Sequence, residues 1–169
     1  DGIFARVWSG DVIAKNQSTF MTEMIEVSNI LNNATSQSFI IFDELWRWTS
    51  TYDGLALTSA ILQYVLKYVK AKTLIATHYH ELIKLEKMYP EVKNYSVSVY
   101  ETDKEVLFMK KIVKGWASKS YGIDVAKIAW IPDEILRLSR EILKWFEAKQ
   151  DSNSHTQIIS TPLFEIQKR

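Results

Sequence analysis

The sequence contains no cysteine and only five glycines among its 169 residues. Without cysteine there can be no disulfide framework, Cys-x-x-Cys redox pair or thiolate zinc site, and the composition is compatible with a cytoplasmic protein. No apolar run approaches the roughly 18 residues that a membrane-spanning helix needs. The N-terminal segment lacks a charged region followed by an apolar stretch, so it does not resemble an export signal.

The sequence also has no large excess of either charge, because its 21 Lys and Arg residues nearly balance its 20 Asp and Glu residues and leave a net charge of +1. A contact with nucleic acid or an acidic membrane would therefore require a local patch. The length and the 47% hydrophobic content suffice for one modest core. The first residue is not Met, and we expect a fragment of a longer protein.

Hydrophobic spacing predicts a strand-helix-strand unit in the middle of the chain. Apolar residues recur every three or four positions over 18–34 and again over 54–69, which predicts two helices. Short continuous apolar runs over 38–45 and 73–77 are typical of strands that are buried on both faces. The two strands should be parallel and adjacent or nearly so.

The second half of the chain predicts a hairpin and a pair of helices. Residues 80–87 favour a helix, and 95–101 with 105–113 resemble an antiparallel hairpin at the edge of the sheet. Helices are expected over 121–129 and 133–148, and the second has an apolar side made of Ile135, Leu138, Ile142 and Phe146. The polar segment from 150 onward is expected to be a flexible tail.

Candidate chemistry lies where the two predicted strands end, since ligands bind beyond the carboxyl ends of parallel strands. Asp43 and Glu44 follow the first strand and His78 follows the second. In a nucleotide hydrolase an Asp holds Mg²⁺ through water and a Glu polarises the attacking water. Alternatively, the acidic pair only ends a strand and begins a loop.

The histidines leave a second class of site open. His78 and His80 would point to one side if the strand continued, and with Asp43 they would make a metal-dependent hydrolase site. Alternatively, His78 is a hydrogen-bonded structural residue. The hydroxyl-rich loop after Glu44 is either a locally hydrogen-bonded turn or a phosphate-facing loop.

Four ordered segments together carry a family resemblance. NQSTFMTEM, FIIFDELWRWTSTYDGLAL, TLIATHYHEL and ASKSYGIDVAKIA with IPDEIL resemble the ATPase domain of the MutS family of bacterial DNA mismatch repair proteins, over about residues 1–148. The resemblance implies an α/β fold, a parallel sheet flanked by helices that forms part of an ABC-type ATPase. It divides the chain into a partial ATPase domain at 1–113, a helix-turn-helix dimerisation element at 114–149 and a tail at 150–169.

The resemblance also implies ATP and Mg²⁺ as cofactors and assigns site residues. Ser18 and Thr19 match the signature segment, which meets a phosphate bound by the opposite subunit, and Asp43 and Glu44 match the Walker B pair, for magnesium and water activation. Further matches are the D-loop with Ser50 and Asp53, and the switch residue His78.

The resemblance also implies further parts of the protein, and partners, that lie outside this chain. The glycine-rich Walker A loop that cradles the phosphates is expected upstream of residue 1. The implied partners are a second MutS-type subunit, clasped by the hairpin at 117–146, and mismatched double-stranded DNA bound by domains outside this chain. The alternatives are an inactive dimerisation module and, for the hairpin, a core-packing helical pair.

Tryptophan is in excess, at six residues against five glycines. Compared with the family, five of them and Asn16 stand where glycine is expected: Trp8, Trp46, Trp48, Trp116 and Trp130. Taken literally, this predicts an inactive ATPase, because an indole supplies neither room nor freedom for positive φ. A single cause would be UGA codons that are read as glycine in the living protein, with Trp145 as a genuine tryptophan.

The tail ends in STPLFEIQKR. Leu163 and Phe164 loosely resemble the short Leu-Phe peptides by which mismatch repair proteins dock to the replication clamp, although the usual upstream Gln is missing. The alternative is a simple linker end.

Overall fold

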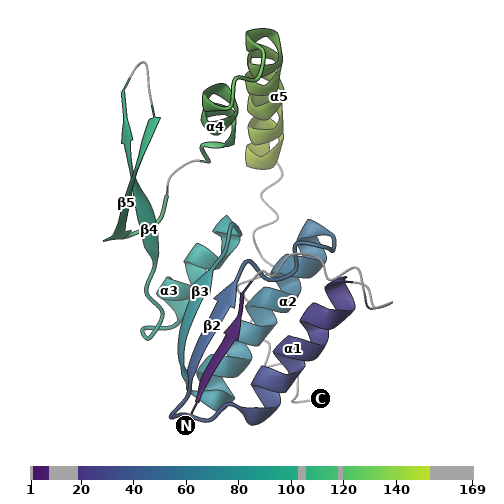
Figure 1. Ribbon diagram of the computed structural model, residues 1–169, viewed down its shortest axis with the longest axis vertical. Coiled ribbons are helices and arrows are strands. Elements are labelled where there is room, and N and C mark those ends of the chain that lie inside the picture. Colours follow the sequence, from purple (N-terminus) through teal and green to yellow (C-terminus); the bar gives the residue numbers. More distant parts are fainter. Residues whose placement is uncertain (1, 8–18, 103–105, 118–119, 153–169) are drawn as a thin grey trace. The chain divides into compact units, whose positions relative to one another are not determined.

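The computed structural model describes residues 2–7, 19–102, 106–117 and 120–152 (Figure 1). The described residues form two compact units, with the boundary between Leu82 and Ile83. The predicted signature residue Ser18 and the tail residues Leu163 and Phe164 lie outside the described residues, as do Trp8 and Asn16. Among the described helices, none is both long and apolar enough to cross a membrane.

The first unit is built on a parallel sheet of three strands, in the order β1 (Ile3–Arg6), β2 (Phe39–Asp43) and β3 (Lys72–Ala76). β2 lies in the middle and pairs in parallel with both neighbours. Ile40 and Phe42 on it are completely buried, as expected for a central apolar strand. The parallel pairing of β2 and β3 confirms the prediction, whereas the four-residue β1 was not predicted.

Two helices connect the strands and pack on the sheet. α1 (Thr19–Asn33) precedes β2, and α2 (Thr51–Tyr64) continues into a π-helical turn, η1 (Val65–Val69), before β3. Figure 1 shows α1 and α2 running alongside the strands. The core joins side chains from α1, β2, the turn after β2 and η1: Val27, Ile30, Ile40, Phe42, Leu45, Trp46, Val65 and Val69. The prediction that the apolar run 73–77 is a strand buried on both faces is wrong, because β3 has no buried residue and Leu74 is 58% exposed.

The buried side of α1 differs from the predicted apolar stripe in one respect. Glu23, Val27 and Ile30 are its buried residues, and their spacing of four and three is that of one helix face. A carboxylate therefore shares the face that packs on the core, and it requires a partner there.

The second unit contains a hairpin and three described helices. Its elements are α3 (Leu85–Met88), β4 (Tyr95–Glu101), β5 (Val106–Lys114), α4 (Gly122–Ile128) and α5 (Asp133–Ser152), after the 3₁₀ helix η2 (His80–Lys84). β4 pairs antiparallel with β5. The prediction that this hairpin lies at the edge of the parallel sheet is wrong, because the two strands form a separate sheet in which their ladder hydrogen bonds go to each other. The predicted division at 113/114 stays a prediction.

Gly54 shows why α2 tolerates no larger residue at its start. A Cβ added there would clash with the Tyr79 hydroxyl and lie 3.3 Å from the Trp46 Cβ, whereas one at Gly122 would meet nothing within 4 Å. The helix therefore approaches the segment after β3 closely at a point where only hydrogen fits.

We expect Gly54→Ala to lower the free energy of unfolding by about 1–3 kcal/mol, because overpacking outweighs the gain in helix propensity. Gly122→Ala is the matched control and should leave stability unchanged or slightly raised. Urea unfolding followed by circular dichroism measures both. Equal effects of the two substitutions would contradict the close packing at Gly54.

Candidate functional site

The carboxyl ends of β2 and β3 bring two of the predicted site residues together. Asp43 is paired with Ala76 in the register of the sheet, and the Glu44 N–H donates to the Ala76 carbonyl at 2.9 Å. The pairing thus continues one residue beyond β2. His78 follows two residues after the end of β3, so parallel pairing places Glu44 and His78 at the same edge.

Glu44 is held in an unusual backbone conformation next to two cationic or ionisable groups. Its φ is +46°, in the left-handed region that side chains other than glycine rarely adopt. Its Oε2 lies 4.0 Å from His78 Nδ1 and 3.5 Å from Arg47 Nε. Both partners are half exposed, so these contacts orient the carboxylate rather than stabilise the fold.

A cavity of about 370 Å³ adjoins this edge, and its lining is mainly polar: Glu44, Trp46, Arg47, Thr49, Thr51, His78 and Tyr79. Tyr79 is buried, and its burial raises the pKa of the phenol, with further increases from the carboxylates of Glu23, Glu81 and Glu44. The phenol therefore stays neutral at physiological pH. The cavity combines a carboxylate, hydroxyls and an imidazole, which suits a hydrated, polar ligand.

The loop after Glu44 forms the predicted local hydrogen bonds. Ser50 is the N-cap of α2, and its hydroxyl accepts a hydrogen bond from the Asp53 N–H at 3.2 Å. Asp53 lies in the first helical turn, where a negative charge is favourable. This arrangement accounts for the Ser-x-x-Asp spacing structurally, and any role of the two residues toward phosphate remains a prediction.

The alternative of a metal-dependent hydrolase built on Asp43, His78 and His80 is not supported. β3 ends at Ala76, and His80 begins the 3₁₀ helix η2, so the two histidines do not lie on one continuing strand. No group of three His, Cys, Asp or Glu residues able to hold a metal occurs in the part of the chain that the structure describes.

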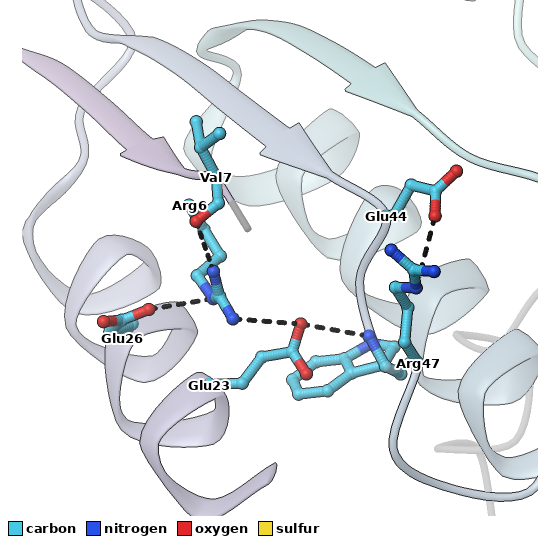
Figure 2. A network of polar contacts seen from close by, with 7 residues as sticks. Arg6, Val7, Glu23, Glu26, Glu44 and Arg47 are labelled. Carbon is cyan, nitrogen blue, oxygen red and sulfur yellow. Dashed lines mark hydrogen bonds and ion pairs between the residues drawn. The ribbon is translucent and has the colours of Figure 1, made fainter. Parts of the chain in front are cut away.

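Sequence reasoning missed an ionic network next to this site, buried at Arg6 and Glu23 and half exposed at Glu26 (Figure 2). Arg6, at the end of β1, lies with Nη2 3.6 Å from Glu23 Oε1 and Nε 2.8 Å from Glu26 Oε2. Glu23 Oε1 also accepts a hydrogen bond of 3.1 Å from the backbone N–H of Trp46. One feature of the sequence could have predicted this network: Glu23 has the helical spacing that puts it on the same face of α1 as Val27 and Ile30.

Two of the five unexpected tryptophans occupy glycine-like backbone positions. Trp46 has φ +68° and Trp130 has φ +62°, which costs a residue with a side chain about 1–2 kcal/mol. Trp46 is buried, and its indole Nε1 is buried without a hydrogen-bond partner. Both penalties would vanish with glycine, and this supports the interpretation that glycine belongs at these two positions.

Trp48 and Trp116, the other two described members of this group, do not have a glycine-like backbone conformation. Trp48 and Trp116 are described and exposed, and neither has a positive φ. Backbone conformation therefore separates the four described positions into two with left-handed geometry and two without it.

The chain is thus an α/β protein with an acidic pair and a histidine at the carboxyl edge of a parallel sheet. The family model described as MutS domain V matches residues 1–147. Similar proteins named "DNA mismatch repair protein MutS" occur in Clostridium tetani, with 48% identity over 99% of this chain, and in Persephonella marina, with 48% identity over 95%. The protein of that name from Caldicellulosiruptor bescii is 56% identical over 87% of the chain.

The chain belongs to the MutS domain V family. It spans 19%, 18% and 17% of the lengths of these three relatives, respectively. The MutS resemblance and the α/β fold with a parallel sheet flanked by helices are therefore confirmed.

Trp130 offers a direct test of the glycine-like positions, because its side chain is 92% exposed and contributes little burial. We expect Trp130→Gly to raise the free energy of unfolding by about 0.5–1 kcal/mol, since relief of the left-handed strain exceeds the entropic cost of glycine. Trp145→Gly, in the interior of α5, is the matched control and should lower it by about 0.5–1 kcal/mol. Destabilisation by both changes would argue against a glycine requirement at 130.

Proposed function

We propose that this chain forms part of an ATP-hydrolysing site in a DNA mismatch repair protein. The observation that carries the proposal is the meeting of Glu44 and His78 at the carboxyl edge of β2 and β3, beside a polar cavity. Membership of the MutS domain V family supports it. The acidic pair at a strand end is the arrangement that nucleotide hydrolases use for metal and water.

The residues at this edge fit Mg²⁺ and a nucleotide phosphate. Carboxylate and hydroxyl oxygens are the ligands that Mg²⁺ prefers, usually through water, and Asp43 and Glu44 present adjacent carboxylates. In the proposal Asp43 holds the ion through its water shell. When bound, Mg²⁺ neutralises developing charge on the phosphate oxygens.

Glu44 is the proposed general base. Its carboxylate accepts a proton from the attacking water, and His78 donates a hydrogen bond toward the terminal phosphate. The backbone at Glu44 is left-handed, with a φ of +46°. Backbone strain of this kind is typical of functional sites.

The remaining site residues belong to a shared, dimeric arrangement. Thr19, which begins α1, and the preceding residue in the sequence, Ser18, would meet a phosphate held by the opposite subunit, with Ser50 and Asp53 at the contact between subunits. Mismatched DNA would bind to parts of the protein outside this chain. A clamp contact through Leu163 and Phe164 stays a prediction.

An inactive dimerisation module is the second candidate, and Trp46 decides between the two. Residue 46 contributes to the lining of the polar cavity beside Glu44, and its indole is buried in the core with Nε1 lacking a hydrogen-bond partner. We propose that Trp46 and Trp130 are glycine in the protein as its source makes it, from UGA codons. The mass of the native protein and the gene sequence test this, and UGG codons would favour the inactive module.

Glu44→Gln in the intact protein should slow ATP hydrolysis by about 10² or more, because the amide cannot accept the proton of water. ATP binding should be retained, since the substitution preserves shape. Steady-state phosphate release and equilibrium nucleotide titration measure the two properties. Glu91→Gln, at an exposed carboxylate of the second unit, is the control and should change neither. Undiminished hydrolysis by Glu44→Gln would refute the assignment.

α5 exposes the predicted apolar side, with Ile135, Leu138, Ile142 and Phe146 all at least 46% exposed. Such a surface favours coverage by a second subunit. We expect Leu138→Glu with Ile142→Glu to weaken dimerisation of the intact protein by at least tenfold, since a buried charge would lack a partner. Analytical ultracentrifugation measures this, with exposed Arg140→Glu as the control; unchanged dimers in the double variant would exclude this face.

A further inference from the structure

The turn that carries Glu44 is strained and needs support from its surroundings. Glu44 and Trp46 both have positive φ, within three consecutive residues. Each such residue costs about 1–2 kcal/mol unless it is glycine, and the conformation persists only if neighbouring structure fixes it. The contacts made by the backbone of this turn therefore decide whether Glu44 keeps its position.

Two backbone hydrogen bonds hold the turn from opposite sides. The Glu44 N–H donates to the Ala76 carbonyl of β3, which extends the sheet. The Trp46 N–H donates to Glu23 Oε1 on α1, at 3.1 Å. The second bond uses only the backbone of residue 46, so it is available with tryptophan or glycine at that position.

Glu23 is itself fixed by a positive charge. It is 2% exposed, and Arg6, 5% exposed, lies with Nη2 3.6 Å from the same Oε1. Arg6 pairs with Phe42 in the sheet register, which puts it beside the end of β2. Its Nη1 donates to the Val7 carbonyl at 2.5 Å, and Glu26 adds an ion pair at Nε that lacks hydrogen-bond geometry.

The buried Arg6–Glu23 pair is not explained by a gain in folding stability alone. Burying a carboxylate and a guanidinium requires desolvation that their attraction often only balances. Glu23 Oε2 is buried with no hydrogen-bond partner, so the carboxylate is incompletely satisfied. Its one hydrogen bond that reaches another element goes to the turn after β2, and this points to a role in placing that turn.

We infer that Glu23 is a positioning residue: charge-paired with Arg6, its carboxylate holds the N–H of residue 46 and thereby keeps Glu44 in its left-handed conformation beside His78. Figure 2 shows the chain of contacts from Arg6 through Glu23 to the turn. Because Glu23 lies one helical turn after Thr19, it also ties the beginning of α1 to this turn. The catalytic part of the inference rests on the proposed function of Glu44.

A matched pair of double variants of the intact protein separates positioning from charge burial. Arg6→Met with Glu23→Gln removes both charges but keeps an oxygen that accepts from the residue 46 N–H. Arg6→Met with Glu23→Leu removes both charges and the acceptor at nearly the same volume. Neither leaves a lone buried charge, so both should fold, and their unfolding midpoints check this.

The first readout does not depend on activity. Hydrogen exchange of a peptide covering residues 44–48 should be about tenfold faster in the Leu variant than in the Gln variant, because one hydrogen bond is lost. Equal exchange in the two variants would overturn the inference.

The second readout tests the consequence for catalysis. kcat for ATP should be about tenfold lower in the Leu variant than in the Gln variant with KM unchanged, since a displaced base slows chemistry without weakening binding. If kcat is equal in the two while Glu44→Gln is inactive, Glu23 does not position the base. If Glu44→Gln is active, the proposed function fails, and the exchange rates alone decide whether Glu23 holds the turn.

Discussion

The parallel pairing of β2 with both of its neighbours is the constraint on which the rest of the first unit depends. Because the three strands run in the same direction, their carboxyl ends meet at one edge. Arg6, Glu44 and His78 all lie at or just beyond these ends. A single sheet register thus brings Glu44 and His78 of the candidate site to one edge, beside the Arg6 that pairs with Glu23.

The turn after β2 is conformationally strained, and it also carries the proposed catalytic base Glu44. Two left-handed residues redirect the chain within three positions, and the redirection frees Glu44 from the core while Leu45 and Trp46 remain buried. The N–H of Glu44 donates to β3 on one side of the turn, and the N–H of Trp46 donates to Glu23 of α1 on the other. The candidate base is therefore held by the same elements that form the hydrophobic core.

Local sequence patterns predicted those elements whose formation depends mainly on the burial of apolar side chains. The apolar run 38–45 contains the buried strand, and the spacing of apolar residues predicted α1, α2 and α5 within a few residues. The start of α2 was predicted at residue 54, whereas the helix begins at Thr51 with Ser50 as its N-cap. By contrast, β1 is too short for a periodic pattern, and the hairpin offered no local sign of the separate sheet that it forms. The excess of tryptophan over glycine was visible in the composition, but only backbone dihedral angles distinguish Trp46 and Trp130 from Trp48 and Trp116.

The sequence by itself determined the family, the alternation of strands and helices, and the identity of Asp43, Glu44 and His78 as candidates, because these depend on residue type and spacing along the chain. Only the tertiary structure decided which of them meet: Glu44 lies beside His78, whereas His80 begins a helix and joins no metal cluster among the described residues. It also revealed the Arg6–Glu23 pair, whose members are 17 residues apart in the sequence. Contacts between distant residues depend on how strands and helices pack, and local periodicity carries no record of that packing.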